Sequence, residues 1–375
     1  MKNNGCNLTR KTHLLRKRIC ILVQCLILGA FLSSLLFSMY QGEYKNINVS
    51  NPKASTTHSP ISIDGNAALD TFFAGKGTDG LSWDTAHVIE DLEIDAEGVG
   101  SGIDIRNTNR FLIIRRCTII NSGNVFVLYT ESGDSGIFLG SVKNAKITES
   151  DVNNNHLGIS LTDANYNIIS DNVISNNRYK GIGTWNASHN TISGNTVSND
   201  GEVIGISLLG YSNYNIISGN TVSNNLGVGV GIYTRMSDHN TISDNEAIYN
   251  SMGISLQYPS NYNTVSGNNA SYNDLYGIKL EYSSENTLSG NYASYNGVYG
   301  INLDSDSDNN EVYQNIVCHN ELVNINDLGE NNDIHDNDDC SQPEGIPSYP
   351  IAWISAIVLC GVAISIYIVQ KSRKK

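Results

Sequence analysis

The chain has 375 residues, 40% of them apolar, and a formal net charge of −14, which allows one large domain with appendages. Basic residues gather in 1–18 and 370–375, where no acidic residue occurs, so the stretch between them is strongly acidic. A nucleic-acid partner needs a basic surface, and this composition therefore excludes a nucleic-acid-binding function.

Two uncharged runs adjoin the basic ends. Residues 19–40 and 351–369 are each long enough to cross a bilayer as a helix of roughly 20 residues. Because positively charged flanks stay in the cytoplasm, we expect cytoplasmic tails at 1–18 and 370–375, with the domain between the spans on the extracellular side of the cell membrane. No small-x-small cleavage site follows residues 19–40, which favours an uncleaved anchor over a cleaved signal peptide.

Residues 41–59 are predicted to be a linker, and residues 60–100 to hold an N-terminal cap and a first coil. Within them, GNAALDTFFAG at 65–75 has the pattern of a short amphipathic helix. A stack of β-coils exposes unpaired strand edges at its ends, and we expect this helix to cover the N-terminal edge.

Internal repeats fill residues 101–325. A Gly-Ile pair returns every 22 to 26 residues, and segments such as GISL and NTIS alternate apolar with small polar residues, as strands do. Helical repeats need longer units, and leucine-rich repeats need several leucines per unit. The predicted fold is therefore all-β, a parallel β-helix of about nine coils. The glycines of the pair are Gly136, Gly158, Gly181, Gly205, Gly231, Gly253, Gly277 and Gly300.

Asparagine returns with the same period, although it is disfavoured in strands. Stacked coils place equivalent residues about 4.8 Å apart, where one amide can bond the next amide and the backbone of its own turn. Seven copies cannot all be active sites, so we interpret the column as a structural ladder. Its members are Asn172, Asn195, Asn220, Asn245, Asn268, Asn291 and Asn315, and a parallel column runs from Asn167 to Asn310.

The repeat GI.L…N.TIS.N..S.N resembles that of right-handed parallel β-helix proteins, in the group that includes carbohydrate-binding proteins, sugar hydrolases and NosD-type periplasmic copper proteins. The upstream stretch SPISIDGNAALDTFF…SGIDIRNTNRFLIIRRCTIINSG is similar to the opening of archaeal members of this group. The resemblance covers about residues 60–325. It implies a right-handed single-stranded parallel β-helix, and it leaves the function open because one fold hosts many activities.

Aromatic residues also form columns. Flat rings with a polar tip suit the faces and hydroxyls of sugars, so these residues are candidate ligand contacts. The alternative is that the rings stack on one another and only stabilise the coils. The largest insertion, 123–134, is a further candidate because solenoid insertions tend to mark the binding face. The candidate rings are Tyr166, His189, Tyr214, His239, Tyr262, Tyr258 and Tyr282, and another column reads Tyr249, Tyr272, Tyr295 and His319.

Candidate catalytic groups are few. Arg235 and Glu281 fall in nearly the same column two coils apart, roughly 10 Å along the axis. They could form half of a lyase or hydrolase site, and a solvated surface pair is the alternative. The sequence strings typical of polygalacturonase-like hydrolases and of alginate-epimerase-like members are absent from this chain.

Residues 326–350 are predicted to be an acidic cap and stalk. A solvated capping segment is the default interpretation of residues 326–339, and loose Ca²⁺ binding is the alternative. The resemblance to NosD raises copper, but His189 and His239 lie two coils apart and cannot share an ion. We therefore expect neither a metal site nor a cofactor. Cys318 and Cys340 could form a disulfide.

These observations favour a non-catalytic cell-surface protein that binds glycan or has a structural role. The alternatives are a polysaccharide-active enzyme on the outer face of the membrane, and a membrane-tethered accessory of a transporter, by analogy with NosD-type proteins. The expected partners are the membrane, a polysaccharide or glycan, and surface proteins.

Overall fold

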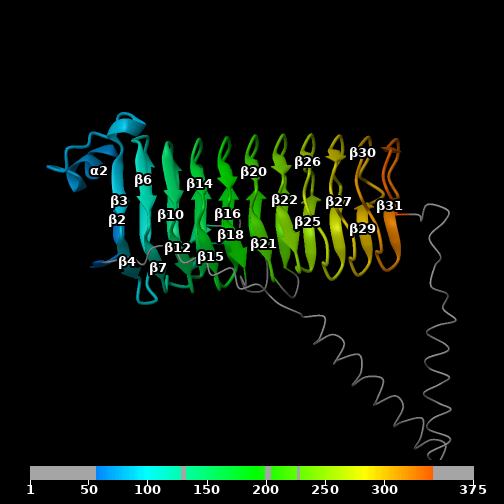
Figure 1. The fold of residues 1–375 in the computed structure, drawn as a ribbon. Helices are drawn as coiled ribbons and strands as arrows, with labels where there is room; N and C mark the ends of the chain where they lie inside the picture. Colours follow the sequence, from blue (N-terminus) through cyan, green and yellow to red (C-terminus); the bar gives the residue numbers. More distant parts are fainter. Residues whose placement is uncertain (1–55, 128–131, 199–203, 226–228, 341–375) are drawn as a thin grey trace, which may run out of the picture. The chain divides into compact units, whose positions relative to one another are not determined.

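The computed structural model describes residues 56–127, 132–198, 204–225 and 229–340. In these residues successive coils follow one another along one axis (Figure 1), and their strands form three sheets, here called A, B and C. All strand pairs within these sheets are parallel, so the chain advances by one strand spacing per coil.

Sheet B has the longest strands and eleven members. Its strands are β2 (Ile61–Asp64), β5 (Ile103–Thr108), β10 (Ser135–Val142), β13 (Leu157–Thr162), β16 (Lys180–Trp185), β19 (Ile204–Leu209), β22 (Val230–Arg235), β25 (Met252–Gln257), β27 (Tyr276–Glu281), β29 (Tyr299–Leu303) and β31 (Val323–Asp327).

Sheet C follows sheet B along each coil and also has eleven members. Its strands are β3 (His87–Glu90), β6 (Leu112–Arg115), β11 (Ala145–Thr148), β14 (Ile168–Ser170), β17 (Thr191–Ser193), β20 (Ile216–Ser218), β23 (Thr241–Ser243), β26 (Thr264–Ser266), β28 (Thr287–Ser289), β30 (Glu311–Tyr313) and β32 (Asp333–His335).

Sheet A has eight members and continues as single parallel bridges towards the C-terminal end. Its strands are β1 (Thr56–His58), β4 (Leu92–Asp95), β7 (Thr118–Ile120), β12 (Asp151–Asn153), β15 (Val173–Ser175), β18 (Thr196–Ser198), β21 (Thr221–Ser223) and β24 (Glu246–Ile248). A separate antiparallel pair joins β8 (Phe126–Val127) to β9 (Ser132–Gly133), inside the predicted insertion 123–134.

The stack has about ten turns, slightly more than the nine expected. The difference arises at the ends, where the Gly-Ile signal is missing but strands still pair. Residues 326–340, predicted as an acidic cap, include β32 and so continue sheet C beyond residue 325.

The core is built by inward side chains that repeat at each level. In sheet B one column consists of isoleucine in all eleven strands, each paired in register with the next. The first ten are at most 3% exposed. β-branched side chains suit a pleated surface, and burying each one stabilises the fold by about 1.5–3 kcal/mol. The column runs Ile61, Ile103, Ile137, Ile159, Ile182, Ile206, Ile232, Ile254, Ile278, Ile301 and Ile325.

The asparagine ladder is confirmed, and Asn220 shows its pattern. Asn220 Oδ1 accepts the backbone N–H and the Nδ2–H of Asn195 in the preceding coil, at 2.9 and 3.0 Å. Its Nδ2 donates to the Ile192 carbonyl and to Asn245 Oδ1, both at 2.9 Å. The other predicted members repeat this Nδ2-to-Oδ1 bond, and Asn315 extends the ladder to Asn337.

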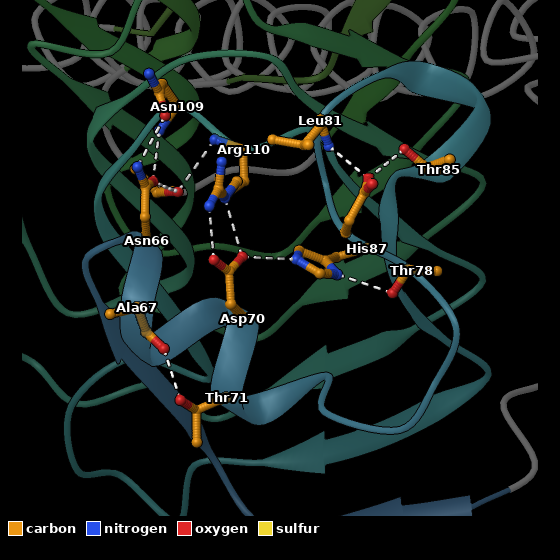
Figure 2. A network of polar contacts seen from close by, with 12 residues as sticks. Asn66, Ala67, Asp70, Thr71, Thr78, Leu81, Thr85, His87, Asn109 and Arg110 are labelled. Atoms are coloured by element: carbon orange, nitrogen blue, oxygen red, sulfur yellow. Dashed lines mark hydrogen bonds and ion pairs between the residues drawn. The ribbon is translucent and has the colours of Figure 1, made fainter.

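The predicted N-terminal helix is present as α2 (Asn66–Phe72) at the blue end of the stack, followed by the 3-10 turn η1 (Trp83–Thr85). Leu69 of α2 is fully buried in the core. Asp70, the next residue of the helix, accepts two hydrogen bonds from Arg110, at 2.9 and 2.7 Å (Figure 2). Its Oδ1 also lies 3.1 Å from Nε2 of the buried His87, whose Nδ1 is 2.9 Å from the Thr78 hydroxyl. This network fixes the cap to the first coils.

The predicted spans, 19–40 and 351–369, and the basic tails lie outside the described residues. Within the described residues, no helix is long and apolar enough to cross a membrane.

Replacing Asn220 by alanine should destabilise the fold. The change removes the side-chain partner of the Asn195 N–H and of the Ile192 carbonyl, and each buried group left without a partner costs about 1–3 kcal/mol. It also breaks the amide-to-amide bonds to Asn195 and Asn245. We expect a loss of at least about 3 kcal/mol, measured by urea unfolding. The control is Asn153→Ala, on the half-exposed outer face of sheet A, which should lose much less. Equal losses would contradict the ladder's role.

Replacing Asp70 by asparagine should loosen the cap in a pH-dependent way. Hydrogen bonds from Arg110 and His87 lower the pKa of Asp70 in the folded chain. Their stabilisation is therefore present above the unfolded pKa of about 4 and is lost as the pH falls through the folded pKa. We expect Asp70→Asn to weaken amide-exchange protection of α2 at neutral pH, and the difference from wild type to vanish in acid.

The matched control for this change is Asp84→Asn, because Asp84 is an exposed acid in the adjacent turn η1. If Asp84→Asn weakened α2 as much as Asp70→Asn, a general charge effect would explain the result instead of the network.

Candidate functional site

The largest outward-facing strand surface belongs to sheet B, because its strands are mostly five to eight residues long whereas those of sheets A and C have three or four. Alternate side chains of β5, β10, β22 and β27 point away from the core. Two groups of polar residues with aromatic neighbours lie on this face, one near the N-terminal coils and one near the C-terminal coils.

The first group lines a cleft of about 480 Å³ over β5, β10 and β13. The cleft lies beside the predicted insertion, which contributes Val125, Gly133 and Asp134 to its wall. Most of the other lining groups are polar side chains from the strands and the turns after them. Those used below are Asp104, Arg106, Phe138, Thr162 and Asp163.

Arg106 is the central group of the cleft. Its Nε and Nη2 donate to the two carboxylate oxygens of Asp104, at 2.8 and 3.0 Å. Its guanidinium also lies over the Phe138 ring, 4.6 Å from the centroid. The Phe138 ring lies against Gly140, where an added Cβ would approach it to 2.8 Å. A glycine at 140 therefore lets the ring lie flat and support Arg106, whose side chain remains half exposed.

Asp134 joins the two ends of the insertion to each other. Its Oδ2 accepts the Val125 N–H at 3.0 Å, and its backbone N–H donates to the Val125 carbonyl at 2.8 Å. Gly123 approaches so closely that a Cβ there would lie 2.1 Å from Asp134 Oδ2. The prediction that 123–134 borders a binding face agrees with the position of the cleft.

The second group contains the predicted pair Arg235 and Glu281. The strand register places Arg235, Gln257 and Glu281 in one column on consecutive strands, so the two lie two coils apart as predicted. They do not pair directly. Arg235 lies over the Tyr258 ring at 5.5 Å, and the Tyr258 hydroxyl donates to Glu281. Lys279 Nζ donates to the other Glu281 oxygen at 2.6 Å.

The pKa values in this group follow from its contacts. Partial burial by itself raises the pKa of Glu281, but hydrogen bonds from Lys279 and Tyr258 outweigh it and hold the pKa below its usual value. Donation to Glu281 raises the pKa of Tyr258. Burial raises the pKa of the neighbouring Tyr233 to about 12. At neutral pH the group thus contains an ionised carboxylate and two protonated phenols.

Lys180, on β16 between the two groups, is only 6% exposed. Burial lowers the pKa of this lysine to about 7. The residue types in the sequence gave no sign of this burial.

The predicted aromatic columns exist, and their rings stack on one another. Neighbouring centroids from Tyr166 to Tyr262 lie 4.8 to 5.2 Å apart, with interplanar angles of 1 to 11°. Tyr258 stacks on Tyr282 at 5.3 Å, and Tyr249 to His319 form a third stack. The face of each inner ring is covered by the next ring, so its exposed part is the edge with the polar atoms.

The rings of the first column lie at a turn position with an unusual backbone, which the non-aromatic Glu285 and Asn309 of the same column share. Every ring in the first column has a positive φ, between 56° and 60°, a conformation that costs a non-glycine residue roughly 1–2 kcal/mol. Each stacked pair stabilises the fold by about 0.5–1.5 kcal/mol, which offsets part of this cost. The alternative that we kept open, in which the rings stabilise the coils, is therefore favoured for the ring faces. Ligand contact through the edges stays a prediction.

The acidic segment 326–339 lies on the last coil, where most of its side chains are exposed. His335 lies 3.1 Å from Asp336 and 3.9 Å from Glu311, and its ring stacks on Tyr313. The hydrogen bond with Asp336 raises the pKa of His335. Loose Ca²⁺ binding by this segment stays a prediction.

The Asp104–Arg106 pair escaped the sequence reasoning, because its only signal is weak: two opposite charges at alternate positions of a strand. The disulfide that the sequence allowed between Cys318 and Cys340 is present, across a separation of 22 residues, one coil period. His319 lies beside them, with one of its ring nitrogens and both sulfurs within 4.8 Å of one another.

Two family models match this chain. The model described as right handed beta helix region matches residues 101–256, and the model described as periplasmic copper-binding protein (NosD) matches residues 205–338. No curated protein matches significantly.

Solved structures share the fold at low identity. A mutant of the periplasmic alginate epimerase AlgG is 20% identical with a TM-score of 0.50, over 77% of this chain and 74% of that one. A double mutant of AlgG is 15% identical, with a TM-score of 0.50, over 75% and 84%. Tailspike protein 2 of Escherichia coli O157:H7 bacteriophage CAB120 is 13% identical, with a TM-score of 0.51, over 70% of this chain but only 38% of its own. These likenesses concern the fold alone.

Substitutions at Tyr214 should separate a stacking role from a binding role. Its ring stacks on His189 at 5.2 Å and on His239 at 4.9 Å. We expect Tyr214→Asn, which tolerates positive φ but loses both stacks, to destabilise the fold by about 1–2 kcal/mol in urea unfolding. Tyr214→Phe keeps the stacks and should be nearly neutral. If Tyr214→Phe instead weakened glycan binding at unchanged stability, the hydroxyl edge would be a ligand contact.

Proposed function

Since this chain belongs to the right-handed parallel β-helix repeat family, we propose that it binds polysaccharide without cleaving it, in the cleft beside residues 123–134. The observation that carries the proposal is the arrangement of Arg106, held by Asp104 and supported by Phe138, in an open cleft. The domain would be displayed outside the cell by the predicted spans 19–40 and 351–369.

The chemistry of the cleft suits sugar hydroxyls. Carboxylates accept hydrogen bonds from hydroxyl groups, and a guanidinium donates several in a fixed plane. Asp104 engages two of the five N–H groups of Arg106, and packing on Phe138 fixes the direction of the others. Fixed polar groups lose little conformational freedom when a ligand binds.

The charge of the cleft restricts the class of polysaccharide. The carboxylates of Asp104, Asp134 and Asp163 line it together with the one guanidinium of Arg106. A polyuronate would bring further negative charges next to these carboxylates, and like charges in a partly enclosed site are costly. A neutral polysaccharide, or one that carries amino groups, avoids this repulsion and is the ligand we propose.

The rival function is a polysaccharide-active enzyme, and the second group favours it. Tyr258 presents a protonated hydroxyl beside the ionised Glu281, next to Lys279 and Arg235. Such a set could protonate a leaving sugar oxygen and stabilise a carboxylate on the substrate. Each charged group of the cluster, however, already has an opposite charge or a ring against it.

Binding should depend on Arg106. We expect the full-length chain to retain chitosan or neutral glucan oligosaccharides more tightly than alginate oligosaccharides, as measured by calorimetry. Arg106→Gln should weaken the preferred interaction by at least about 10-fold, because hydrogen bonds to charged groups contribute about 1.5–3 kcal/mol. The matched control is Arg178→Gln, an exposed arginine outside the cleft, which should bind like wild type.

Two results would overturn this proposal: tighter binding of alginate, or unchanged binding by Arg106→Gln. The same samples should be assayed for new reducing or unsaturated chain ends. Their appearance, and their loss in Tyr258→Phe, would establish the enzyme instead.

A further inference from the structure

The C-terminal coil contains a cluster of soft and borderline metal ligands. The Cys318–Cys340 disulfide has the His319 side chain beside it, and one ring nitrogen and both sulfurs lie within 4.8 Å of one another. Cys318 is buried, Cys340 is half-buried and His319 is exposed, so solvent reaches the cluster from one side.

The coil repeat places these groups together. Cys318 follows Ser294 by one coil, and its backbone N–H donates to the Ser294 hydroxyl at 3.0 Å. His319 continues the third ring stack, 4.9 Å from Tyr295 with nearly parallel planes. Cys340 is held by a 2.8 Å hydrogen bond from its N–H to Asp338 Oδ1. Cys318 is therefore tied to the preceding coil by its backbone, while His319 is held by its ring stack and Cys340 by a local hydrogen bond, independently of the disulfide.

We propose that reduction of the disulfide converts this cluster into a zinc site with Cys318, Cys340 and His319 as ligands. Two molecules of a low-molecular-weight thiol reduce the disulfide to two protein thiols and leave as their own disulfide. Zn²⁺ then binds both sulfurs as thiolates, with release of their two protons, and binds a ring nitrogen of neutral His319.

Zinc fits the ligands of this cluster better than calcium or copper(I) does. Two thiolates and an imidazole are ligands that zinc accepts in a tetrahedral site, with water in the fourth position. Calcium prefers oxygen ligands, which the cluster itself does not offer. Copper(I) also accepts thiolates. However, the negative charges of the two thiolates and of the adjacent Asp338 and Asp339 attract the doubly charged zinc ion more strongly than the singly charged copper(I) ion.

A bound zinc ion would stabilise the last coil in place of the disulfide. Cys318 precedes the last coil and Cys340 ends it, so either the disulfide or a shared ion closes the loop of that coil. Closing a loop lowers the conformational entropy of the unfolded chain. A metal ion that binds only the folded state also shifts the folding equilibrium towards that state. The last coil would thus remain fastened under both oxidising and reducing conditions.

The test uses the full-length chain with Cys6, Cys20, Cys25 and Cys360 replaced by serine in every sample. Zinc is titrated against a chromophoric chelator, before and after reduction with a phosphine that is then removed. We expect no tight site in the oxidised chain and one zinc per chain after reduction. His319→Ala should lower the zinc affinity of the reduced chain by at least about 10-fold, since replacing a residue that only hydrogen-bonds a metal ligand already lowers metal affinity by that factor.

The matched control is His335→Ala, because His335 also stacks on a tyrosine of the preceding coil but has no cysteine beside it. It should bind zinc like the parent. Cys340→Ser should abolish the site, and circular dichroism checks that it folds, which the half-buried terminal position favours. The proposal is overturned if the reduced chain binds no zinc, if His319→Ala binds as tightly as the parent, or if the oxidised chain binds equally well.

Discussion

The structure depends on one constraint, the stacking of a buried side-chain amide on its copy in the next coil. In each rung the amide oxygen accepts from the coil below, and the amide nitrogen donates to the coil above and to a backbone carbonyl. A group that both donates and accepts can repeat indefinitely without leaving a buried atom unpaired. Because the ladder fixes the register of each turn, it also fixes the level of every other side chain.

The same register produces the other columns. Isoleucine stacks on isoleucine in the core, tyrosine alternates with histidine on the surface, and two cysteines one period apart form a disulfide. A repeated column is a poor place for a specific site, since each copy has the same surroundings. The cleft lies where the repeat is interrupted, at residues 123–134 and at the charged pair of β5.

The sequence predicted the features that depend on period alone. Equal spacing identified Asn220 and Tyr214 as column members before any coordinates, and it placed Arg235 two coils from Glu281. It could not show that the ring faces are covered, because this depends on side-chain torsions. Nor could it show that Tyr258 lies between Arg235 and Glu281, or that Lys180 is buried, because neighbouring coils decide both. The final strands were missed because β31 and β32 pair through their backbone without the Gly-Ile signal.

Repulsion between carboxylates explains why the ladder contains asparagine and not aspartate, and the same repulsion acts in the cleft. Two carboxylates 4.8 Å apart repel each other by roughly 3 kcal/mol at an effective dielectric constant of about 20, and a ladder would repeat that cost at every rung. The buried ladder is accordingly built of neutral amides. The cleft departs from this rule, since Asp104, Asp134 and Asp163 share one space with a single arginine. Hydrogen-bond donors from a ligand would add to those that Arg106, Val125 and Asn186 already give to these carboxylates.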